Sequence, residues 1–346
     1  MRTWTGVTLA ILLAVGAPAA AQAQTELTFS TWVAHNHPLN QYVFFKWAEA
    51  VEKETRGQVK IRTLPKPIAA PNQHYDAVIK GQVDLGFATY GYQPERFMPY
   101  LIAELPFLGE TAIDTSVALW RTHKSHIEKI GIHKDVHVLG IMTHGPGYMH
   151  HATRPILKPE DLRGQKIRVG GDVPAAIVKH FGGVVITQPA PKSYEILSQG
   201  IADGIFFPTE SLKSFNITKL VPHTTYVKGG TYSSSFWFAM NKARWEKLDK
   251  PIQDAITRVS GEAFAWLAGG GWDRADREGL AEAKANGNTF QEASPEFAAE
   301  LRRLTAELET DYAAKLDRLG LDGKAVIKAF RAEVAKVAEE RKKKGS

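Results

Sequence analysis

The feature that most constrains this chain is an internal repeat, two segments far apart in the sequence that share one pattern. The first reads HYDAVIKGQVDLGFATYG from His74, and the second reads SYEILSQGIADGIFFPTE from Ser193. In each, a Tyr is followed six positions later by Gly and three positions after that by Asp. Each segment also follows a similar basic strand pattern, GQVKIRTLP from Gly57 and GQKIRVGGD from Gly164. A strand–helix–Gly–Asp–strand unit that occurs twice indicates two related α/β lobes.

Strand and helix patterns alternate along each half of the chain. They begin soon after the N-terminus and restart in mid-chain with DVHVLGIMTHG from Asp135. Such alternation is typical of α/β lobes with largely parallel sheets. Because 346 residues are too many for one ordinary core, the restart marks a second lobe. We expect the first lobe to comprise 24–145 with part of 235–285, and the second to comprise 146–234 with the C-terminal helices of 286–346.

The C-terminal part of the sequence is helical in pattern. A long run over 251–287 keeps helical character but contains Gly269, Gly270 and Gly271 in succession. A glycine costs about 1 kcal/mol in a helix interior, so we expect a kink or break there. The next segment, from Ser294, carries a short apolar stripe at helical spacing. A stripe of this length favours a surface helix packed on a lobe over a coiled coil.

The N-terminus has the three parts of a secretory signal peptide. Arg2 provides the basic start, VTLAILLAV (7–15) the apolar centre, and AQA (21–23) the A-x-A cleavage site. The apolar centre is too short to span a membrane, and the alternative is a buried N-terminal helix. We therefore expect residues 1–23 to be removed and the mature protein to reach the periplasm. The chain has no cysteine, which excludes disulfides, thiolate zinc sites and Cys nucleophiles.

Charge and motif content argue against nucleic-acid binding and against catalysis. The formal net charge is +6, and much of the excess lies in the tail RKKKGS, which is typical of a solvated end. A mild positive field favours an anionic small ligand, although weakly. The glycine-rich stretches lack phosphate-loop spacing, and there is no G-x-S-x-G elbow. We expect no nucleic-acid partner and no enzymatic activity, with an exported hydrolase left as an alternative.

Histidines occur in two groups that could suggest a metal. AHNH contains His35 and His37, and HGPGYMHH contains His144, His150 and His151. No carboxylate accompanies them at helical metal spacing, and no H-E-x-x-H is present. We therefore expect neither a metal nor a cofactor, and place His35 at the mouth of the cleft instead.

The ends of the repeated strands are the expected ligand site, because α/β lobes bind ligands beyond the carboxyl ends of their strands. Asp84 and Asp203 open these strands, and we expect them to cap turns at the far end, in a structural role. Two lobes with matching strand ends facing one another form a clamshell. The strand ends would bring aromatic rings to the cleft between them, Tyr90 and Tyr92 from the first lobe and Phe206 and Phe207 from the second.

Two arginines hold equivalent positions in the repeat, Arg62 in KIRTLP and Arg168 in KIRVGG. An arginine on a strand is usually solvated, and we expect that of Arg62. Arg168 is followed by VGGD, whose glycines, Gly170 among them, allow a ligand close to the backbone. A guanidinium matches a carboxylate with two parallel hydrogen bonds. From the residues alone, Arg168 is either an anion ligand or one more solvated strand residue.

At these residues the sequence resembles the periplasmic substrate-binding subunits of tripartite ATP-independent periplasmic (TRAP) transporters, the C4-dicarboxylate-binding-protein-like family. The matching motifs lie between Trp47 and Leu248 and include WAEAVEKETRGQVKI, YDAVIKGQVDLGF, GYQPERF, ELPFL, RPILKPEDLRGQKIRV, YEILSQGIADG and NKARWEKL. The resemblance implies a periplasmic-binding-protein clamshell of α/β class, with a long helix spanning both lobes and a helical C-terminus. It also implies a monomer that closes about hinges near Gly145 and Ser234 on an organic acid and delivers it to a membrane TRAP permease. A sensor that docks on a membrane receptor would use the same fold and stays an alternative.

The resemblance also identifies ligand-binding residues and the kind of ligand. In the family, the Arg of KIRV clamps the ligand carboxylate, and Arg168 matches it. Met149 lies in the region where a second Arg often stands, and Phe207 stands where an Asn usually contacts the ligand. Both departures make the pocket less polar and favour a monocarboxylate with an apolar or aromatic body. The other predicted contacts are Trp32, His35, Tyr90, Tyr92, Gly170 and Tyr232.

Overall fold

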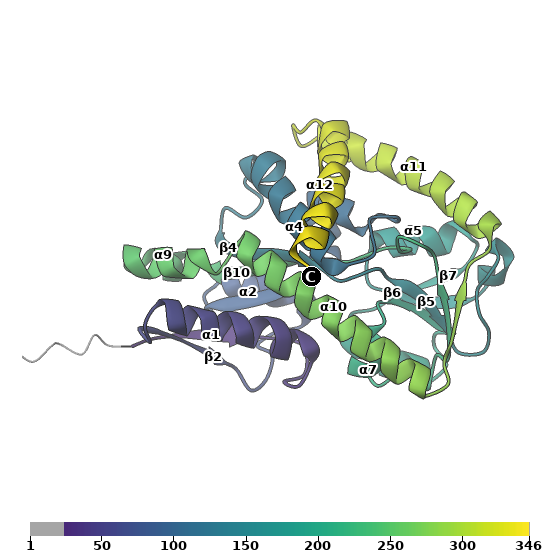
Figure 1. The fold of residues 1–346 in the computed structure, drawn as a ribbon, viewed down its shortest axis with the longest axis horizontal. Coiled ribbons are helices and arrows are strands. Elements are labelled where there is room, and N and C mark those ends of the chain that lie inside the picture. The colour runs from purple at the N-terminus through teal and green to yellow at the C-terminus, as the bar shows by residue number, and fades with distance from the viewer. Residues whose placement is uncertain (1–23, 346) are drawn as a thin grey trace, which may run out of the picture.

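The computed structural model describes residues 24–345, which form two α/β lobes (Figure 1). The predicted signal peptide lies outside the described residues. The first lobe contains a five-stranded sheet in which β1, β2 and β3 are parallel, whereas β10 is antiparallel to both β3 and β4. In sheet order these strands are β2 (Val59–Thr63), β1 (Thr25–Ser30), β3 (Leu85–Thr89), β10 (Ser235–Asn241) and β4 (Val136–Thr143).

The second lobe contains a six-stranded sheet. Strands β7, β6 and β8 are parallel, β9 and β11 are parallel, and β5 is antiparallel to β8 and β9. Both sheets are therefore mixed rather than purely parallel, because β10 and β5 belong to the strands by which the chain crosses between the lobes. In sheet order the strands are β11 (Thr289–Glu292), β9 (His223–Tyr226), β5 (Tyr148–His151), β8 (Gly204–Phe207), β6 (Lys166–Val169) and β7 (Val184–Thr187).

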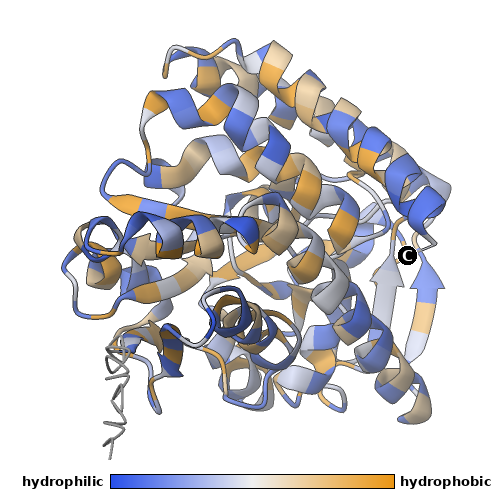
Figure 2. Ribbon diagram, turned by 60° about the vertical axis from the view of Figure 1, so that its left-hand side comes forward, coloured by the Kyte–Doolittle hydropathy of each residue, from blue (hydrophilic) through white to orange (hydrophobic). Residues whose placement is uncertain are grey.

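Helices cover both sheets, and in Figure 2 many of them carry hydrophilic and hydrophobic residues in turn, as amphipathic helices do. The α-helices are α1 (Phe45–Glu54), α2 (His74–Ile79), α3 (Pro94–Phe97), α4 (Ala112–Thr122), α5 (Asp172–His180), α6 (Ser193–Ser198), α7 (Glu210–Ser214), α8 (Lys242–Glu246), α9 (Lys250–Arg258), α10 (Glu262–Ala285), α11 (Pro295–Asp317) and α12 (Gly323–Lys344). Short 3-10 or π segments are η1 (Asn40–Phe44), η2 (Pro71–Gln73), η3 (Tyr90–Tyr92), η4 (Met98–Glu104), η5 (His123–Ile127), η6 (Glu128–Ile130), η7 (Pro159–Leu162) and η8 (Ala190–Lys192). Across 24–345, no helix combines the length and the apolar character that a membrane span needs.

The internal repeat occupies equivalent places in the two sheets, α2–Gly81–β3 in the first and α6–Gly200–β8 in the second. Both glycines are left-handed, with φ of +66° and +67°, a conformation that ends a helix without strain only for glycine. Each repeated aspartate accepts a backbone N–H of the neighbouring parallel strand, Asp84 from Thr28 at 2.7 Å and Asp203 from Lys166 at 2.8 Å. The aspartates are thus structural, as expected, although they bind the adjacent strand rather than capping a turn.

The long helix α10 is unbroken across its three glycines, so the expected break is wrong. Figure 1 shows α10 crossing from the first lobe to α7 in the second, and it packs against α4 and α7. A Cβ on Gly269 would lie 2.4 Å from Cα of Ile113, and a Cβ on Gly271 would lie 2.7 Å from Cγ2 of Val43. Gly269 and Gly271 are therefore contact surfaces for α4 and η1. Close packing of the backbones offsets the low helix propensity of glycine.

The two C-terminal helices pack differently on the lobes. Helix α11 packs against α5 and η7 of the second lobe and also against η4 of the first, whereas α12 packs along α4 of the first. Assigning all of 286–346 to the second lobe is therefore wrong for α12. The buried carboxylate of Asp114 in α4 forms an ion pair with Arg341 of α12, with Nε–Oδ1 at 2.8 Å, which draws α12 onto the first lobe.

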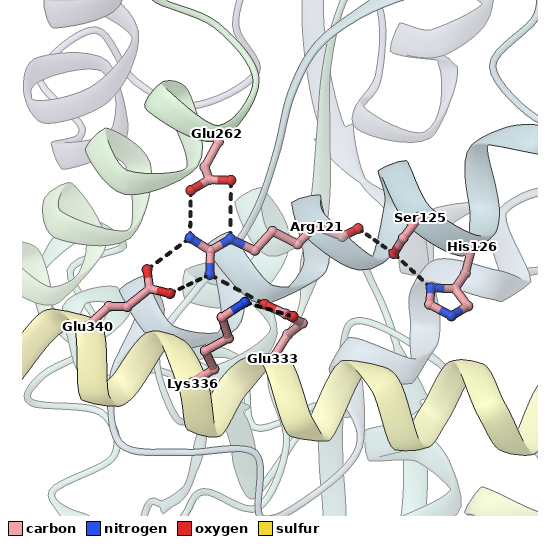
Figure 3. Close-up of polar contacts among 7 residues, drawn as sticks. All are labelled: Arg121, Ser125, His126, Glu262, Glu333, Lys336 and Glu340. Atoms are coloured by element: carbon pink, nitrogen blue, oxygen red, sulfur yellow. Dashed lines mark hydrogen bonds and ion pairs between the residues drawn. The ribbon is translucent and has the colours of Figure 1, made fainter.

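A cluster of charges joins three helices at one end of the first lobe (Figure 3). Arg121 at the end of α4 contacts Glu262 at the start of α10, with Nη2–Oε1 at 2.7 Å. The same guanidinium reaches Glu340 at 2.9 Å and Glu333 at 3.3 Å, both in α12. Single exposed ion pairs stabilise proteins little, but a partly buried arginine shared by three carboxylates holds a fixed geometry. This network ties the long inter-lobe helix and the C-terminal helix to α4.

The glycines of α10 give a stability prediction with a built-in control. Gly269→Ala should lower the free energy of unfolding by about 1–3 kcal/mol, because its Cβ would clash with the backbone of α4. Gly270→Ala should raise it by about 1 kcal/mol, because nothing lies within 4 Å of its Cβ position and alanine favours helix. Thermal unfolding of both variants tests this. Equal melting temperatures would show that α10 does not need the close contact.

Candidate functional site

A closed cavity lies between the two lobes, beyond the carboxyl ends of β1, β3, β6 and β8. Its free volume is about 40 Å³, so the lobes must separate to admit an organic molecule. The lining consists mainly of aromatic and aliphatic side chains, with a small number of polar groups. The lining residues are Trp32, Val33, His37, Leu39, Thr89, Tyr92, His144, Arg168, Gly170, Ala190, Phe207, Pro208, Glu210, Ser211, Phe215, Tyr232, Ser234, Phe236 and Trp272.

Arg168 is the cationic group of this cavity. It lies on β6 of the second lobe, its side chain is 2% exposed, and its Nε and Nη2 donate to the backbone oxygen of Gln188 at 2.9 and 2.6 Å. The guanidinium carbon lies 4.5 Å from the centre of the Phe207 ring. Burial lowers the pKa of Arg168, and the neighbouring hydroxyls of Tyr92 and Tyr232 act in the opposite direction. Throughout 24–345, no carboxylate lies within ion-pair distance of this guanidinium.

Glycines keep the space around Arg168 open and the lobes close. A Cβ on Gly170 would lie 3.2 Å from Nη2 of Arg168, so a side chain there would crowd the guanidinium. A Cβ on Gly91, in the first lobe, would lie 3.5 Å from the backbone oxygen of Gly170 in the second. The two lobes therefore meet backbone to backbone next to Arg168.

The first lobe contributes two aromatic rings to the cavity. Tyr92 follows β3 in η3, and its hydroxyl accepts the backbone N–H of Ala190 in the second lobe at 2.9 Å. Trp32 follows β1, and its indole nitrogen donates to the backbone oxygen of Phe87 at 3.1 Å. The Trp32 and Tyr92 rings lie edge to face, 6.1 Å apart. The first lobe thus presents an aromatic wall opposite Arg168, with one direct hydrogen bond between the lobes from Tyr92.

The structure brings together most of the site residues that the sequence predicts. Six line the cavity, namely Trp32, Tyr92, Arg168, Gly170, Phe207 and Tyr232. Three do not. His35 is exposed with its ring on Phe45, Tyr90 is buried in the first lobe with its hydroxyl bonded to His133, and Met149 is buried in the core. The geometry of η3 turns Tyr90 away from the cleft, strand alternation does so for Met149, and His35 lies in the loop between β1 and η1.

Several lining residues are not predicted from the sequence. Glu210 directly follows the strand end that supplies Phe207, so the same strand-end argument could have identified it. His37 belongs to the AHNH motif, which suggests a metal ligand rather than a contact to an organic ligand. Among the described residues, no group of three or more His, Cys, Asp or Glu is arranged to hold a metal. Trp272 and Phe215 reach the cavity from helices or loops, and no local sequence signal identifies them.

Glu104 lies behind the cavity at the junction of the lobes. Its Oε1 accepts hydrogen bonds from the backbone nitrogen and the hydroxyl of Ser235 at 3.3 and 3.2 Å, and its Oε2 has no partner in the described chain. A Cβ on Gly171 of the second lobe would lie 3.0 Å from that Oε2. Burial raises the pKa of Glu104 to about 8, because the charged form is deprived of water.

A second, larger groove of about 1030 Å³ runs along α10 and is more open to solvent. It contains Asp276, whose Oδ1 accepts hydrogen bonds from Thr209 and from the backbone of Glu210. Its acidic groups thus have partners of their own. We place the ligand site in the smaller cavity because that cavity holds a buried cation without an acidic partner.

The chain matches known proteins over most of its length. The family model for bacterial extracellular solute-binding proteins, family 7, matches residues 29–315. A curated relative, the outer membrane transporter protein TsaT of Comamonas testosteroni, is 31% identical over 92% of this chain and 94% of its own length.

Solved structures match the fold over about nine tenths of the chain. A TRAP periplasmic solute-binding protein from Bordetella bronchiseptica, with bound (R)-mandelate and (S)-mandelate, is 37% identical with a TM-score of 0.88, covering 90% of this chain and 99% of that one. A TRAP solute-binding protein from Rhodoferax ferrireducens, in complex with copurified benzoate, is 27% identical with a TM-score of 0.85, covering 91% and 99%. The two-lobed binding-protein fold predicted from the sequence is confirmed.

Glu104 gives a prediction about pH. The folded protein holds its proton up to about pH 8, whereas a free glutamic acid releases it near pH 4.5. The contribution of this group to stability is therefore complete below about pH 4.5 and falls as the pH rises to about 8. In Glu104→Gln the side chain does not titrate, so this fall in stability with pH should be absent. The melting temperature of the variant should therefore exceed that of the wild type by roughly 3 °C or more at pH 8 and by little at pH 5.

The matched control is Glu195→Gln, which changes a half-exposed glutamate on the surface of the second lobe. Its difference from the wild type should stay flat between pH 5 and pH 8. A flat difference for Glu104→Gln as well would contradict the buried, protonated state of Glu104.

Proposed function

This chain belongs to the family 7 bacterial extracellular solute-binding proteins, and we propose that it captures an aromatic monocarboxylate and delivers it to a membrane TRAP permease. Proteins of this family are substrate-binding transport components rather than enzymes. The ligand is an organic acid held between the lobes. The protein acts in the periplasm as a monomer, and its ligand carboxylate is held by Arg168.

The observation that carries this proposal is the buried guanidinium of Arg168. An isolated buried charge is costly unless it is paired and hydrogen-bonded. Here the backbone oxygen of Gln188 satisfies one edge of the guanidinium, but no carboxylate of residues 24–345 neutralises it. A ligand carboxylate would supply that charge through short charge-assisted hydrogen bonds. Gly170 leaves the room for it.

The apolar lining supports a ring as the body of the ligand. Phe207 lies beneath Arg168 and stacks on Phe215, with ring centres 5.4 Å apart and planes at 9°. Trp32, Phe236 and Trp272 complete the aromatic walls. Aromatic rings prefer such offset or edge-on neighbours. The relatives with bound mandelate and benzoate are consistent with a ligand of this kind.

Capture follows from movement of the lobes about the crossing strands. The chain leaves the first lobe after β4 and returns before β10, and these two segments are paired by hydrogen bonds at Gly147 and Tyr232. Rotation there opens the cavity, the acid enters, and closure brings Tyr92 to the backbone of Ala190. Closure removes water from around Arg168 and the carboxylate, which strengthens their attraction. A ring-bearing acid is larger than the present free volume and would hold the lobes slightly further apart than in the structure.

The first experiment is native mass spectrometry of the mature protein, followed by denaturing extraction of any small molecule that copurifies. An aromatic monocarboxylic acid is the expected result. A neutral sugar or a C4-dicarboxylate would contradict the proposal. An empty protein would be followed by calorimetric titration with benzoate, phenylacetate and mandelate, and failure of all three to bind would contradict it as well.

The role of Arg168 gives a direct prediction. Arg168→Met removes the charge and the guanidinium, and should weaken binding of the aromatic acid by two orders of magnitude or more, since losing one partner of a buried pair costs about 3–5 kcal/mol. Arg62→Met is the matched control, because Arg62 holds the equivalent position in the repeat but forms a surface ion pair with Glu26 at 2.5 Å. It should leave the affinity unchanged. Unaltered affinity of Arg168→Met, by calorimetry, would remove Arg168 from the site.

A further inference from the structure

Two buried polar atoms without partners face each other within the ligand cavity. Nε2 of His37 and Oε2 of Glu210 lie 3.8 Å apart, too far for a hydrogen bond, and neither has another partner in the described residues. Both side chains are almost completely buried, at 2% and 1% exposure, and both residues line the cavity. His37 belongs to the first lobe and Glu210 begins α7 of the second. Their juxtaposition therefore exists only when the lobes are closed.

The local hydrogen bonds assign one donor and one acceptor to this pair. Nδ1 of His37 accepts the backbone N–H of Leu39 at 3.2 Å, so the proton of the neutral ring is on Nε2. Burial lowers the pKa of His37 to about 3, which keeps the ring neutral. The hydroxyl of Ser211 donates to Oε1 of Glu210, which leaves Oε2 as a free acceptor. The cavity thus presents an N–H and a carboxyl oxygen side by side.

The pair is separated from Arg168 by two aromatic rings. The guanidinium lies 4.5 Å from the Phe207 ring, Phe207 stacks on Phe215 at 5.4 Å, and the Phe215 ring lies 5.5 Å from the His37 ring, edge to face. This series of contacts follows one wall of the cavity. The cation and the polar pair therefore stand at opposite ends of an apolar wall.

We propose that His37 and Glu210 form a subsite for a hydroxyl group on the ring of the ligand, remote from its carboxylate. The hydroxyl oxygen accepts a hydrogen bond from Nε2–H of His37, and the hydroxyl group donates a hydrogen bond to Oε2 of Glu210. The inference rests on the proposed function, because it presumes an aromatic acid whose carboxylate lies at Arg168. It adds a specificity: the preferred ligand is a hydroxylated aromatic monocarboxylate.

A hydroxyl fits the pair better than other substituents. An ionised second carboxylate or a sulfonate has no proton to donate to Oε2 of Glu210, and an ammonium group offers no lone pair to His37. An unsubstituted ring would leave both buried polar atoms without partners, which is unfavourable. Because the two residues come from different lobes, a bound hydroxyl also links the lobes in the closed state.

The test compares ring-hydroxylated acids with their parents by isothermal titration calorimetry at pH 7.5. The probes are benzoate with its 3- and 4-hydroxy derivatives, and phenylacetate with its 3- and 4-hydroxy derivatives. At least one hydroxylated isomer should bind wild-type protein tenfold or more tightly than its parent, equivalent to about 1.4 kcal/mol. In His37→Phe and in Glu210→Met this advantage, taken as the ratio of the hydroxylated acid's affinity to that of its parent within the same variant, should fall below threefold.

His35→Phe is the matched control, the same change two positions away on an exposed side chain outside the cavity. It should keep the full preference. Two substitutions on different lobes keep the test valid if one variant fails to fold, which circular dichroism would show. Parent acids that bind with no isomer preferred, or a preference that survives both substitutions, would overturn the subsite alone. Failure of every aromatic acid to bind the wild type would overturn the proposed function with it.

Discussion

The guanidinium of Arg168 is buried on β6, an inner strand of the second lobe, with a backbone carbonyl as its hydrogen-bond partner and an aromatic ring beneath it. Many features of the cleft accommodate this single charge. Gly170 leaves the space beside the guanidinium free of a side chain, and Tyr92 from the opposite lobe bonds to the adjoining backbone. The rings of Phe207 and Phe215 form an apolar wall next to the charge. Because the protein provides no carboxylate for this buried cation, the closed state without a ligand contains an unneutralised charge, which is unfavourable. On our proposal the ligand supplies the missing charge, which couples capture to closure.

Other buried polar groups depend on the same closure. Glu104 is covered where the two lobes meet, and His37 and Glu210 face each other from different lobes. Each has a side-chain atom without a partner within the chain that the structure describes. Buried unpaired groups are rare in proteins, so four of them around one cleft, with Nε1 of Trp272 as the fourth, indicate that the cleft is built for an occupant rather than for maximal stability. The protein keeps these groups in place through rigid surroundings: the unbroken helix α10, its contact with α4, and the charge network of Arg121.

The sequence predicted the two-lobed fold but only part of the cavity, and particular residues show why. The repeat identified both lobes, because left-handed glycines such as Gly81 and strand-opening aspartates carry their geometry in local sequence. It also placed Arg168 and Phe207 at strand ends, where position along a strand is enough. It failed for Tyr90 and Met149, whose direction depends on which face of a turn or strand meets the cleft. It also failed at Gly269, where helix propensity was outweighed by packing against α4.

By itself the sequence determined the two α/β lobes and the family, and it placed Arg168 at a strand end, because repeats, strand ends and charge are local properties. Only the tertiary structure decided the shape and chemistry of the cavity. His37 and Glu210 are far apart in the chain and carry no shared motif, yet folding and closure place an N–H and a carboxyl oxygen 3.8 Å apart. Trp272 reaches the same cavity from a helix that crosses both lobes. Such juxtapositions arise from the packing of distant segments, which no local pattern encodes.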